Sequence, residues 1–285
     1  MIKVKSLQEV SRLAFAHMKP GALTNQVLTP DEYRGDIAGG KMSAYEWPGG
    51  VMFLRRRGTY QLLSFVVSDA GSLPDCVLPV DVVCEVAYKP TGAGNAAQAV
   101  EFWGRMGLEP VFERIRLARD AAKELDAPTS RLCERSEAIQ RPSLPEFPGL
   151  PSICLAAPCD FDAVMTLLYA CFDRITGHIP DLDELTASIG AEHVLCMKDC
   201  LGAVCGLLRW VPRGASVEIR QLALREDMRG KGLVRSLVDA FLECTGGKKT
   251  TVWARDGYAP ALKSYTAAGF APDGWRSAVL ILPFK

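Results

Sequence analysis

The spacing of hydrophobic residues in 152–285 differs between segments: the first segments have helical spacing, and the next have continuous apolar runs typical of strands. Apolar residues recur every three or four positions over residues 161–175, directly after Asp160, a common type of helix N-cap. Residues 181–189 fit a second helix. Runs rich in aliphatic residues follow and predict strands at 193–197, 203–211 and 217–224.

The same pattern continues toward the C-terminus. An amphipathic stretch begins at Leu233, and Gly246 and Gly247 end it, since glycine often terminates helices. After it we expect a strand at 250–254, a helix at 260–268 and a strand at 278–282. Strands and helices that alternate in this way predict an α/β fold.

A short segment near residue 100 recurs near residue 262. Ala99, Trp103, Gly107 and Pro110 reappear 162 positions later as Ala261, Tyr265, Gly269 and Pro272. Each copy follows a strand-like run, at 82–88 and 250–254. Repetition with the same neighbours favours a duplicated unit over a chance match.

A proline-rich segment separates the two copies. Prolines 142, 145, 148 and 151 exclude a long helix or a central strand, so a surface linker is expected, and residues 118–125 before it have a helical composition. We therefore predict a first domain at 1–117, a linker at 118–151 and a second domain at 152–285.

Composition narrows the class of protein. The 33 basic residues balance 33 acidic ones, so no net positive charge attracts nucleic acid or an anionic membrane. Apolar stretches are shorter than a bilayer requires, and the first residues lack a secretory pattern. None of the ten cysteines forms a C-x-x-C pair. The expectation is a cytoplasmic protein that binds no nucleic acid, no membrane and no metal.

A glycine-containing turn joins the run at 217–224 to the helix that begins at Leu233. The turn is Arg229-Gly230-Lys231-Gly232. A strand that leads through such a turn into a helix presents free N–H groups to a phosphate, and two basic side chains add to the attraction. An ordinary helix start with flexible glycine is the alternative, and neither the Walker nor the dinucleotide spacing is present.

This segment resembles the coenzyme A-binding motif Q/R-x-x-G-x-G/A of the GNAT superfamily of N-acetyltransferases. Arg229 and Gly232 match its first two positions, and Val234 stands where the family usually has glycine or alanine. Farther on, A-x-x-x-Y-x-x-x-G-F resembles the second signature of the family, with Tyr258 in place of its usual asparagine. The resemblance covers residues 152–285.

The resemblance implies two GNAT-like domains in tandem and a mixed sheet that splays open between two central strands, with acetyl-CoA in the gap as co-substrate. Backbone groups of Leu222, Ala223 and Leu224 then pair with the pantetheine arm. The implied pyrophosphate site consists of the turn (Arg229, Gly230, Lys231, Gly232) and the N–H groups of Leu233, Val234 and Arg235.

Transfer of an acyl group to an amine needs a proton donor and a proton acceptor. The resemblance implies Tyr265 as the acid for the departing thiolate; the alternative is a core aromatic residue. Glu218 is the candidate base. Arg220 either pairs with Glu218 and lowers its pKa or holds a carboxylate of the substrate. Asp181 and Asp183 border the implied acceptor site, and their alternative role is a solvated helix cap.

The first half looks like a degenerate copy. No R-x-x-G-x-G occurs between residues 60 and 89, residues 71–79 are too short and proline-broken for the missing helix, and Trp103 replaces the phenol of Tyr265. We expect it to bind no coenzyme and to close one side of the acceptor site. Arginines 55–57 fit the solvated turn of a hairpin with strands at 52–54 and 59–67.

The predicted function is transfer of an acetyl or short acyl group from coenzyme A to a small-molecule amine, by a monomer or homodimer. A non-catalytic acyl-CoA sensor or scaffold is one alternative. Aminoacyl transfer from charged tRNA is another, and the balanced charge and the coenzyme motif argue against it.

Overall fold

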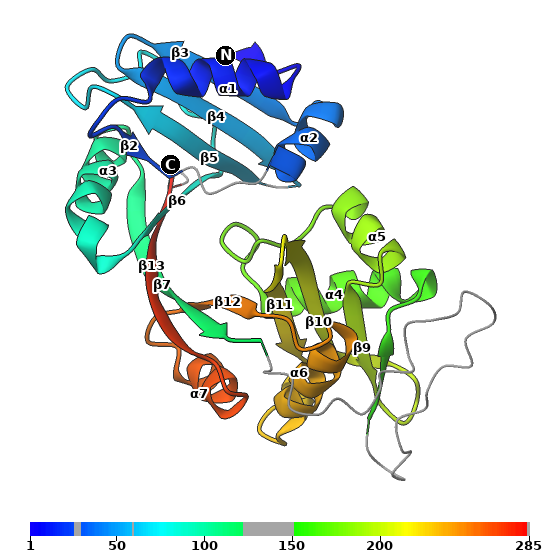
Figure 1. The fold of residues 1–285 in the computed structure, drawn as a ribbon. Helices are drawn as coiled ribbons and strands as arrows, with labels where there is room; N and C mark the ends of the chain where they lie inside the picture. The colour runs from blue at the N-terminus through cyan, green and yellow to red at the C-terminus, as the bar shows by residue number, and fades with distance from the viewer. Residues whose placement is uncertain (26–29, 59, 122–150, 284–285) are drawn as a thin grey trace.

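A computed structural model of the chain describes residues 1–25, 30–58, 60–121 and 151–283. These residues form one 13-stranded mixed sheet in the order β1-β3-β4-β5-β6-β13-β7-β12-β11-β10-β9-β8, with β2 on β5. The sheet curls, so that its two ends face each other across the middle strands (Figure 1).

In the N-terminal half, five strands precede the crossover to β6. Its elements are β1 (Ile2–Lys3), α1 (Leu7–His17), β2 (Leu23–Thr24), α2 (Pro30–Ala38), β3 (Met42–Trp47), β4 (Gly50–Arg57), β5 (Tyr60–Val67), β6 (Val82–Tyr88), α3 (Ala93–Arg105) and β7 (Glu109–Arg119). Residues 68–81, between β5 and β6, form no helix, as the proline content predicts.

The C-terminal half repeats this order without a counterpart of β2 and adds one helix. Its elements are β8 (Ser152–Leu155), α4 (Phe161–Cys171), α5 (Leu182–Gly190), β9 (Val194–Lys198), β10 (Val204–Arg213), β11 (Ser216–Leu224), α6 (Leu233–Cys244), β12 (Thr250–Arg255), α7 (Ala259–Ala267) and β13 (Ala271–Ile281). Each helix and strand predicted after residue 160 is confirmed, and only α6 lacks a counterpart in the first half.

Three boundaries differ from the sequence prediction. Helix α4 ends at Cys171, because Phe172 has extended backbone angles. Strand β13 begins at Ala271, since pairing with β7 extends it seven residues toward the N-terminus. The helical composition at 118–125 was misleading: Ala118 and Arg119 belong to β7, where β12 and β13 flank them. Residues 122–150, most of the predicted linker, lie outside the described residues.

The two halves exchange their last strands. Strand β7 pairs with β12 of the second half, and β13 pairs with β6 of the first, while β7 and β13 pair with each other. Their bounds, Glu109–Arg119 and Ala271–Ile281, are separated by the 162 positions of the sequence repeat. The duplication predicted from sequence is therefore visible in the fold. The predicted boundary at residue 117 falls within β7.

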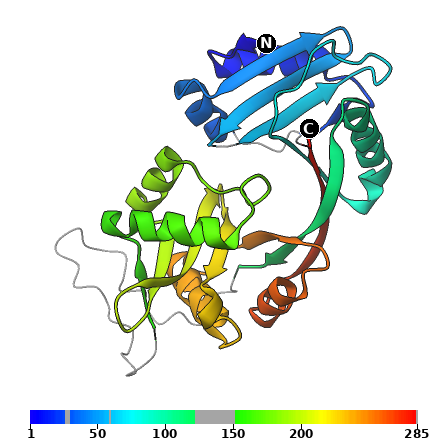
Figure 2. The same cartoon turned by 180° about the vertical axis from the view of Figure 1, so that it is seen from behind.

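Helices cover the two faces of the sheet unequally. One face carries α3, α6 and α7; α3 packs on β6, β7 and β13, and α6 packs on β9 and β10. The other face carries α1 and α2 at one end and α4 and α5 at the opposite end. The same arrangement is seen from behind in Figure 2. The middle of this second face, over β6, β13, β7 and β12, has no helix on it among the described residues.

Candidate functional site

Strands β11 and β12 run parallel for only three residue pairs and then diverge. The pairs are Val217 with Thr250, Glu218 with Thr251 and Ile219 with Val252. Beyond them Leu222, Ala223 and Leu224 pair only with β10 on their other side. Among the described residues no strand covers their edge toward β12, where the resemblance places a pantetheine arm, and the carbonyl oxygen of Leu224 accepts from Arg229.

The turn after β11 is shaped by two glycines with left-handed backbone angles. Gly230 has φ of 73° and Gly232 has φ of 75°. A Cβ atom at either position meets no heavy atom within 4 Å, so the space beside both is open. Residues with side chains disfavour these angles. The geometry explains both glycines and leaves room for a ligand against the backbone.

Helix α6 begins at Leu233 without a side-chain cap. Among the described residues, the N–H groups of Leu233 and Val234 have no hydrogen-bond acceptor. The N–H of Arg235 donates to the carbonyl oxygen of Gly232 at 3.1 Å, so only two of the three predicted donors are free. The helix dipole adds positive potential at the same point. This corner of the molecule is suited to bind an anion.

The basic side chains of the turn have different surroundings. Arg229 donates from Nε to the carbonyl oxygen of Leu224 at 3.1 Å, which ties the turn to the end of β11. Lys231 is exposed and has no carboxylate partner among the described residues. The ammonium of Lys231 is therefore the cation of this turn that is available to a phosphate.

Tyr265 lies on α7 and is 8% exposed. Its ring packs edge-on against Phe270, with centroids 5.6 Å apart. Burial raises the pKa of its phenol far above the ordinary value. The phenol thus stays protonated at neutral pH. The structure confirms the packing role of the ring, and the role of the hydroxyl as an acid stays a prediction.

Glu218 is held by two arginines. It accepts hydrogen bonds from Nη1 of Arg220 at 2.6 Å and from Nε of Arg213 at 3.0 Å. Burial opposes ionisation, but the charges of Arg220 and Arg213 outweigh it and lower the pKa of Glu218. The pairing between Arg220 and Glu218, one of the two alternatives from sequence, is present. A carboxylate with a lowered pKa is a weak proton acceptor.

Arg220 occupies a bulge of β11. Arg209 pairs with Gln221 and Trp210 with Ile219, so Arg220 has no residue opposite it on β10. The bulge lies directly after the last pair between β11 and β12, where the two strands begin to separate. Bulges re-aim side chains near functional sites. Here the bulge aims Arg220 at Glu218 and at a histidine that sequence analysis did not select.

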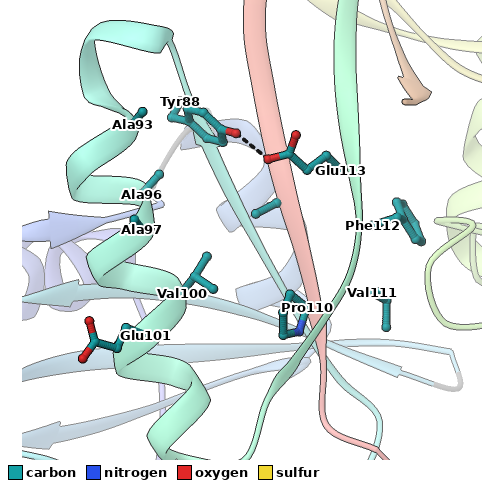
Figure 3. Close-up of a pocket in the computed structure, with 11 residues that line it drawn as sticks. Tyr88, Ala93, Ala96, Ala97, Val100, Glu101, Pro110, Val111, Phe112 and Glu113 are labelled. Atoms are coloured by element: carbon teal, nitrogen blue, oxygen red, sulfur yellow. Dashed lines mark hydrogen bonds between the residues drawn. The ribbon is translucent and has the colours of Figure 1, made fainter. Parts of the chain in front are cut away.

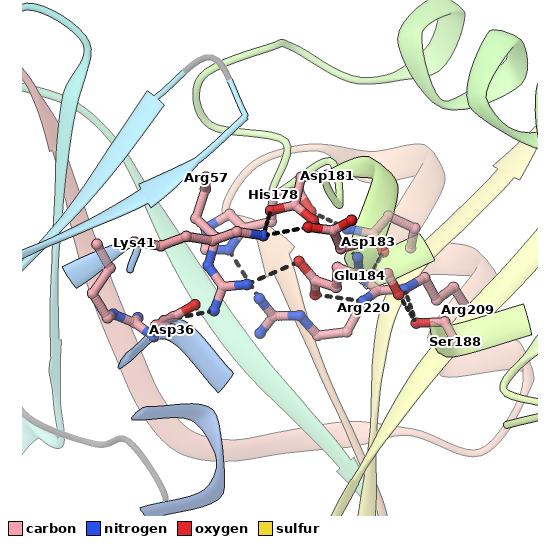
Figure 4. A network of polar contacts seen from close by, with 12 residues as sticks. Asp36, Lys41, Arg57, His178, Asp181, Asp183, Glu184, Ser188, Arg209 and Arg220 are labelled. Atoms are coloured by element: carbon pink, nitrogen blue, oxygen red, sulfur yellow. Dashed lines mark hydrogen bonds and ion pairs between the residues drawn. The ribbon is translucent and has the colours of Figure 1, made fainter. Parts of the chain in front are cut away.

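That histidine, His178, connects the two halves (Figure 4). Nη2 of Arg220 lies 3.1 Å from Nδ1 of His178, and Nε2 of His178 lies 2.7 Å from Glu85 on β6. Nη1 of Arg114 also lies 3.1 Å from Nε2, so both ring nitrogens of His178 face a guanidinium group. Arg114 on β7 also pairs with Glu85, at 2.7 Å. No spacing in the sequence indicates these partners.

These contacts change the pKa values of Glu85 and His178. Burial opposes ionisation of Glu85, but Arg114 and His178 outweigh it and keep the pKa of Glu85 well below its ordinary value. Burial also lowers the pKa of His178. Near neutral pH the network therefore contains a carboxylate, a neutral imidazole and two guanidinium groups.

A second group of ion pairs joins α5 to the first half. Glu184 accepts from Arg57 of β4 at 3.0 Å and from Arg209 of β10 at 2.5 Å. Arg57 also pairs with Asp36 at 3.1 Å. Burial opposes ionisation of Glu184, but Arg209 and Arg57 lower its pKa to about 2.

The prediction of a solvated arginine turn at 55–57 was wrong. The hairpin exists, but Arg55 is 4% exposed and pairs with Asp36, and Arg57 reaches Glu184 of the other half. Buried arginines need carboxylate partners. The sequence does not reveal them because they lie 19 and 127 positions away.

Asp181 is the N-cap of α5. Its Oδ1 accepts the N–H of Glu184 at 2.9 Å, which confirms the cap. Lys41 of the first half pairs with Asp181 at 2.8 Å and with Asp183 at 3.1 Å. The side chain of Asp183 is 86% exposed. A lysine therefore already faces both carboxylates, and their contact with an acceptor stays a prediction.

A cavity of about 540 Å³ lies elsewhere, between α3 and β7 (Figure 3). Small and apolar residues of α3 form one wall, and Tyr88, which bonds to Glu113 at 2.5 Å, lies at one end. None of the site residues predicted from sequence lines it. A cavity of about 90 Å³ lies beside the ion pairs, between Arg57, Tyr60 and Asp181.

The described residues contain neither a membrane-spanning helix nor a group of metal ligands. No helix in this part of the chain is long and apolar enough to cross a membrane. No three metal-ligating side chains gather there.

We expect the charge on Glu218 to support stability in a pH-dependent way. Since its pKa is lower in the folded state, its ion pairs stabilise the protein above the unfolded pKa of about 4.3, and the effect disappears as pH falls through the folded pKa. Glu218→Gln should therefore cost about 3 kcal/mol at pH 7, because Arg213 and Arg220 lose a buried partner.

Urea unfolding of both proteins at pH 7 and pH 3 measures this effect. The difference between them should shrink strongly at pH 3. Glu243→Gln, at an exposed position of α6, is the control and should change little at either pH. An equal loss for Glu218→Gln at both pH values would mean that packing, and not charge, is what the substitution removes.

Comparison with solved structures identifies the fold. An acetyltransferase of the GNAT family from Colwellia psychrerythraea matches with a TM-score of 0.55 and 10% identity, over 98% of this chain and 97% of that one. The GCN5-related N-acetyltransferase from Sphaerobacter thermophilus matches with 0.53 and 14%, over 81% and 76%. That from Kribbella flavida matches with 0.51 and 12%, over 89% and 93%.

Sequence comparison adds no relative. No family model matches the sequence, and no similar sequence is found among curated proteins. The likeness of the structures extends over both halves, and each half repeats the same order of strands. The chain thus has the fold of the GNAT acetyltransferases in tandem, as its two motifs predict.

Proposed function

We propose that this chain, which has the tandem fold of the GNAT acetyltransferases, transfers an acetyl or other short acyl group from coenzyme A to a small-molecule amine. One observation carries the proposal. The free N–H groups of Leu233 and Val234 follow the turn after β11, whose last residues, Leu222–Leu224, do not pair with β12. A diphosphate can bind these N–H groups, and an extended arm that contains amides can pair with the free edge of β11.

The residues assign a place to each part of acetyl-CoA. The pyrophosphate binds the N–H groups at the start of α6, with Lys231 as counter-charge. The pantetheine arm follows the free edge of Leu222–Leu224 and pairs with its main-chain groups. The thioester then lies near the bulge at Arg220, where the two strands meet.

The reaction is direct acyl transfer. The amine nitrogen attacks the thioester carbonyl carbon, a tetrahedral intermediate forms, and the carbon–sulfur bond breaks. Tyr265 is the proposed donor of a proton to the departing thiolate. Burial raises the pKa of its phenol, which keeps the proton on Tyr265 at neutral pH and also makes the phenol a weaker acid. The nucleophile must first lose a proton from its ammonium form.

Glu218 is the proposed acceptor of that proton, and its ion pairs limit this role. Its lowered pKa makes it a weak base. The contacts favour a second role, in which Glu218 holds Arg220 at the bulge and water removes the proton. Activity at Glu218→Gln separates these roles: a base leaves a rate that rises with pH, whereas a positioning residue leaves the pH profile unchanged.

The first half supports the second without a coenzyme site of its own. Its loop at 68–81 has no counterpart of α6. Trp103 is fully buried and packs against Phe65 and Phe102. Strand β7, Arg57 and Glu85 instead reach the second half. We propose that this half forms one wall of the acceptor site.

Val234 bears on the sensor alternative. The side chain of Val234 packs against the hydrophobic core under α6 and so leaves the turn open. A non-catalytic acyl-CoA sensor would be favoured if Val234 blocked the pyrophosphate site. Because its side chain packs against the core, this argument for the sensor is weakened. The tRNA alternative is disfavoured by the balanced charge.

Thiol release tests the proposal. Purified protein is mixed with acetyl-CoA and a panel of amines, and free thiol is measured while CoA binding is followed by thermal shift. We expect binding and amine-dependent thiol release. Binding without turnover on any amine would favour the sensor. Binding of tRNA at moderate salt would favour aminoacyl transfer.

A further inference from the structure

The middle of the sheet, on the face that carries no helix there among the described residues, bears an alternation of cationic and aromatic side chains. We call it the aromatic–cation strip; it consists of Lys89, Phe112, Arg114, Arg116, Trp253, Arg255 and Trp275. These residues come from β7, β12, β13 and the end of β6. Strands of both halves thus contribute to one surface.

Stacked contacts order one part of the strip. The guanidinium carbon of Arg116 lies 5.7 Å from the ring centre of Trp253 and 5.1 Å from that of Trp275. Nζ of Lys89 lies 5.4 Å from the Trp275 ring. Stacking fixes the planar guanidinium of Arg116 without using its N–H groups, which donate to Asp273 at 2.7 Å.

In the other part of the aromatic–cation strip, Arg114 and Arg255 lie side by side. Arg255 and Arg114 are directly opposite each other on β12 and β7. Their guanidinium carbons lie 4.7 Å and 5.6 Å from the same Phe112 ring. Like charges at opposed positions of a sheet repel each other. An anion bound between or beside them removes this cost.

Only some of the charge in the strip is neutralised. Arg114 pairs with Glu85 and Arg116 with Asp273, both at 2.7 Å. Arg255 and Lys89 are exposed and have no carboxylate partner among the described residues. Two positive charges therefore remain on this surface of a chain whose net charge is zero.

The strip borders the place where acyl transfer is proposed. Trp253 and Arg255 directly follow Val252, the last residue of β12 that pairs with β11. On the other side, Arg114 connects through Glu85 and His178 to Arg220 at the bulge. A molecule held on the strip therefore lies next to the thioester.

We propose that the aromatic–cation strip binds an anionic group of the acceptor, so that the substrate is an amine that also carries a carboxylate or a phosphate. Arg255, with Lys89 as second cation, contacts the oxyanion. The proposal rests on the proposed function, because it specifies the acceptor of the same reaction. Two free cations suit one such group; a nucleic acid needs more.

Matched pairs of amines test the proposal. The pairs are phenylalanine with phenethylamine and phosphoethanolamine with ethanolamine, and kcat/KM is measured for each with acetyl-CoA. In at least one pair we expect the anionic member to react about tenfold better or more, as for a charge-assisted hydrogen bond. The pair that shows the preference distinguishes carboxylate from phosphate. Similar rates in both pairs, within about twofold, would overturn the proposal.

Substitutions connect the preference to the strip. Arg255→Gln should remove most of the preference for the anionic amine, and Lys89→Gln should act in the same direction. Arg12→Gln, on an exposed part of α1, is the control. A preference that survives Arg255→Gln contradicts the assignment.

A binding measurement separates this proposal from the proposed function. If no amine is acylated, the transferase proposal fails, and tryptophan fluorescence with CoA present still reports on Trp253 and Trp275. The anionic members should then change the fluorescence at lower concentration than the neutral ones. If neither member binds, or if single-stranded RNA binds and competes, the strip is not a site for a small anionic amine.

Discussion

Replacing Gly232 by glutamate is expected to abolish coenzyme A binding. The new carboxylate enters the open space beside the N–H groups of Leu233 and Val234, where it repels a diphosphate and competes for the same donors. We expect affinity to fall by about 10³-fold or more, roughly 4 kcal/mol. Titration calorimetry with CoA measures the effect.

Gly246→Glu is the matched control at the other end of α6. Gly246 has φ of 60° and also has open space around its Cβ position, so both substitutions introduce the same side chain at a similar backbone strain. Its CoA affinity should match that of the unchanged protein. Retained affinity in Gly232→Glu, in a protein that is folded by circular dichroism, would place the coenzyme elsewhere.

Tyr265→Phe is expected to lower kcat by about 10²-fold, the usual contribution of a general acid. The affinity for CoA should change little, since the ring and its contact with Phe270 are kept. Steady-state kinetics and calorimetry on the same protein measure both effects. Because the pKa of the phenol is raised, the unchanged enzyme should show no loss of activity from Tyr265 ionisation below pH 10.

Tyr258→Phe is the control for loss of a phenol nearby. Tyr258 is 54% exposed at the start of the same helix. Tyr258→Phe should leave kcat unchanged. Turnover in Tyr265→Phe equal to that of the unchanged protein would remove Tyr265 from the mechanism and leave it only its packing role.

The sequence predicted those features that depend on residues close together in the chain. Helix α6 could be read from its apolar periodicity and its glycines, and the turn before it could be read as an anion site from Arg229-Gly230-Lys231-Gly232. The repeat of 162 positions predicted two equivalent units. These features depend on neighbours within a few residues, which the sequence displays directly.

Features that depend on distant partners could not be read in this way. The exchange of β7 and β13 rests on pairing with β12 and β6, between residues more than 130 positions apart, and either strand has the same pattern whichever neighbour it takes. The arginines at 55–57 have the composition of an exposed turn, yet Asp36 and Glu184 bury two of them. His178 also lacks any local signal, because its partners lie on other strands.

The exchanged strands also govern the order in which the molecule can assemble. When a ribosome has released residues up to Arg119, β6 and β7 have emerged, but the strand that joins them is encoded from Ala271 onward. Until residues 250–281 are made, the free edge of β6 and both edges of β7 therefore have no strand to pair with. Contacts so remote in sequence form slowly, and open edges attract other chains meanwhile. Nascent chains stalled between these points should thus depend on chaperones, and neither half expressed alone should reach the native state.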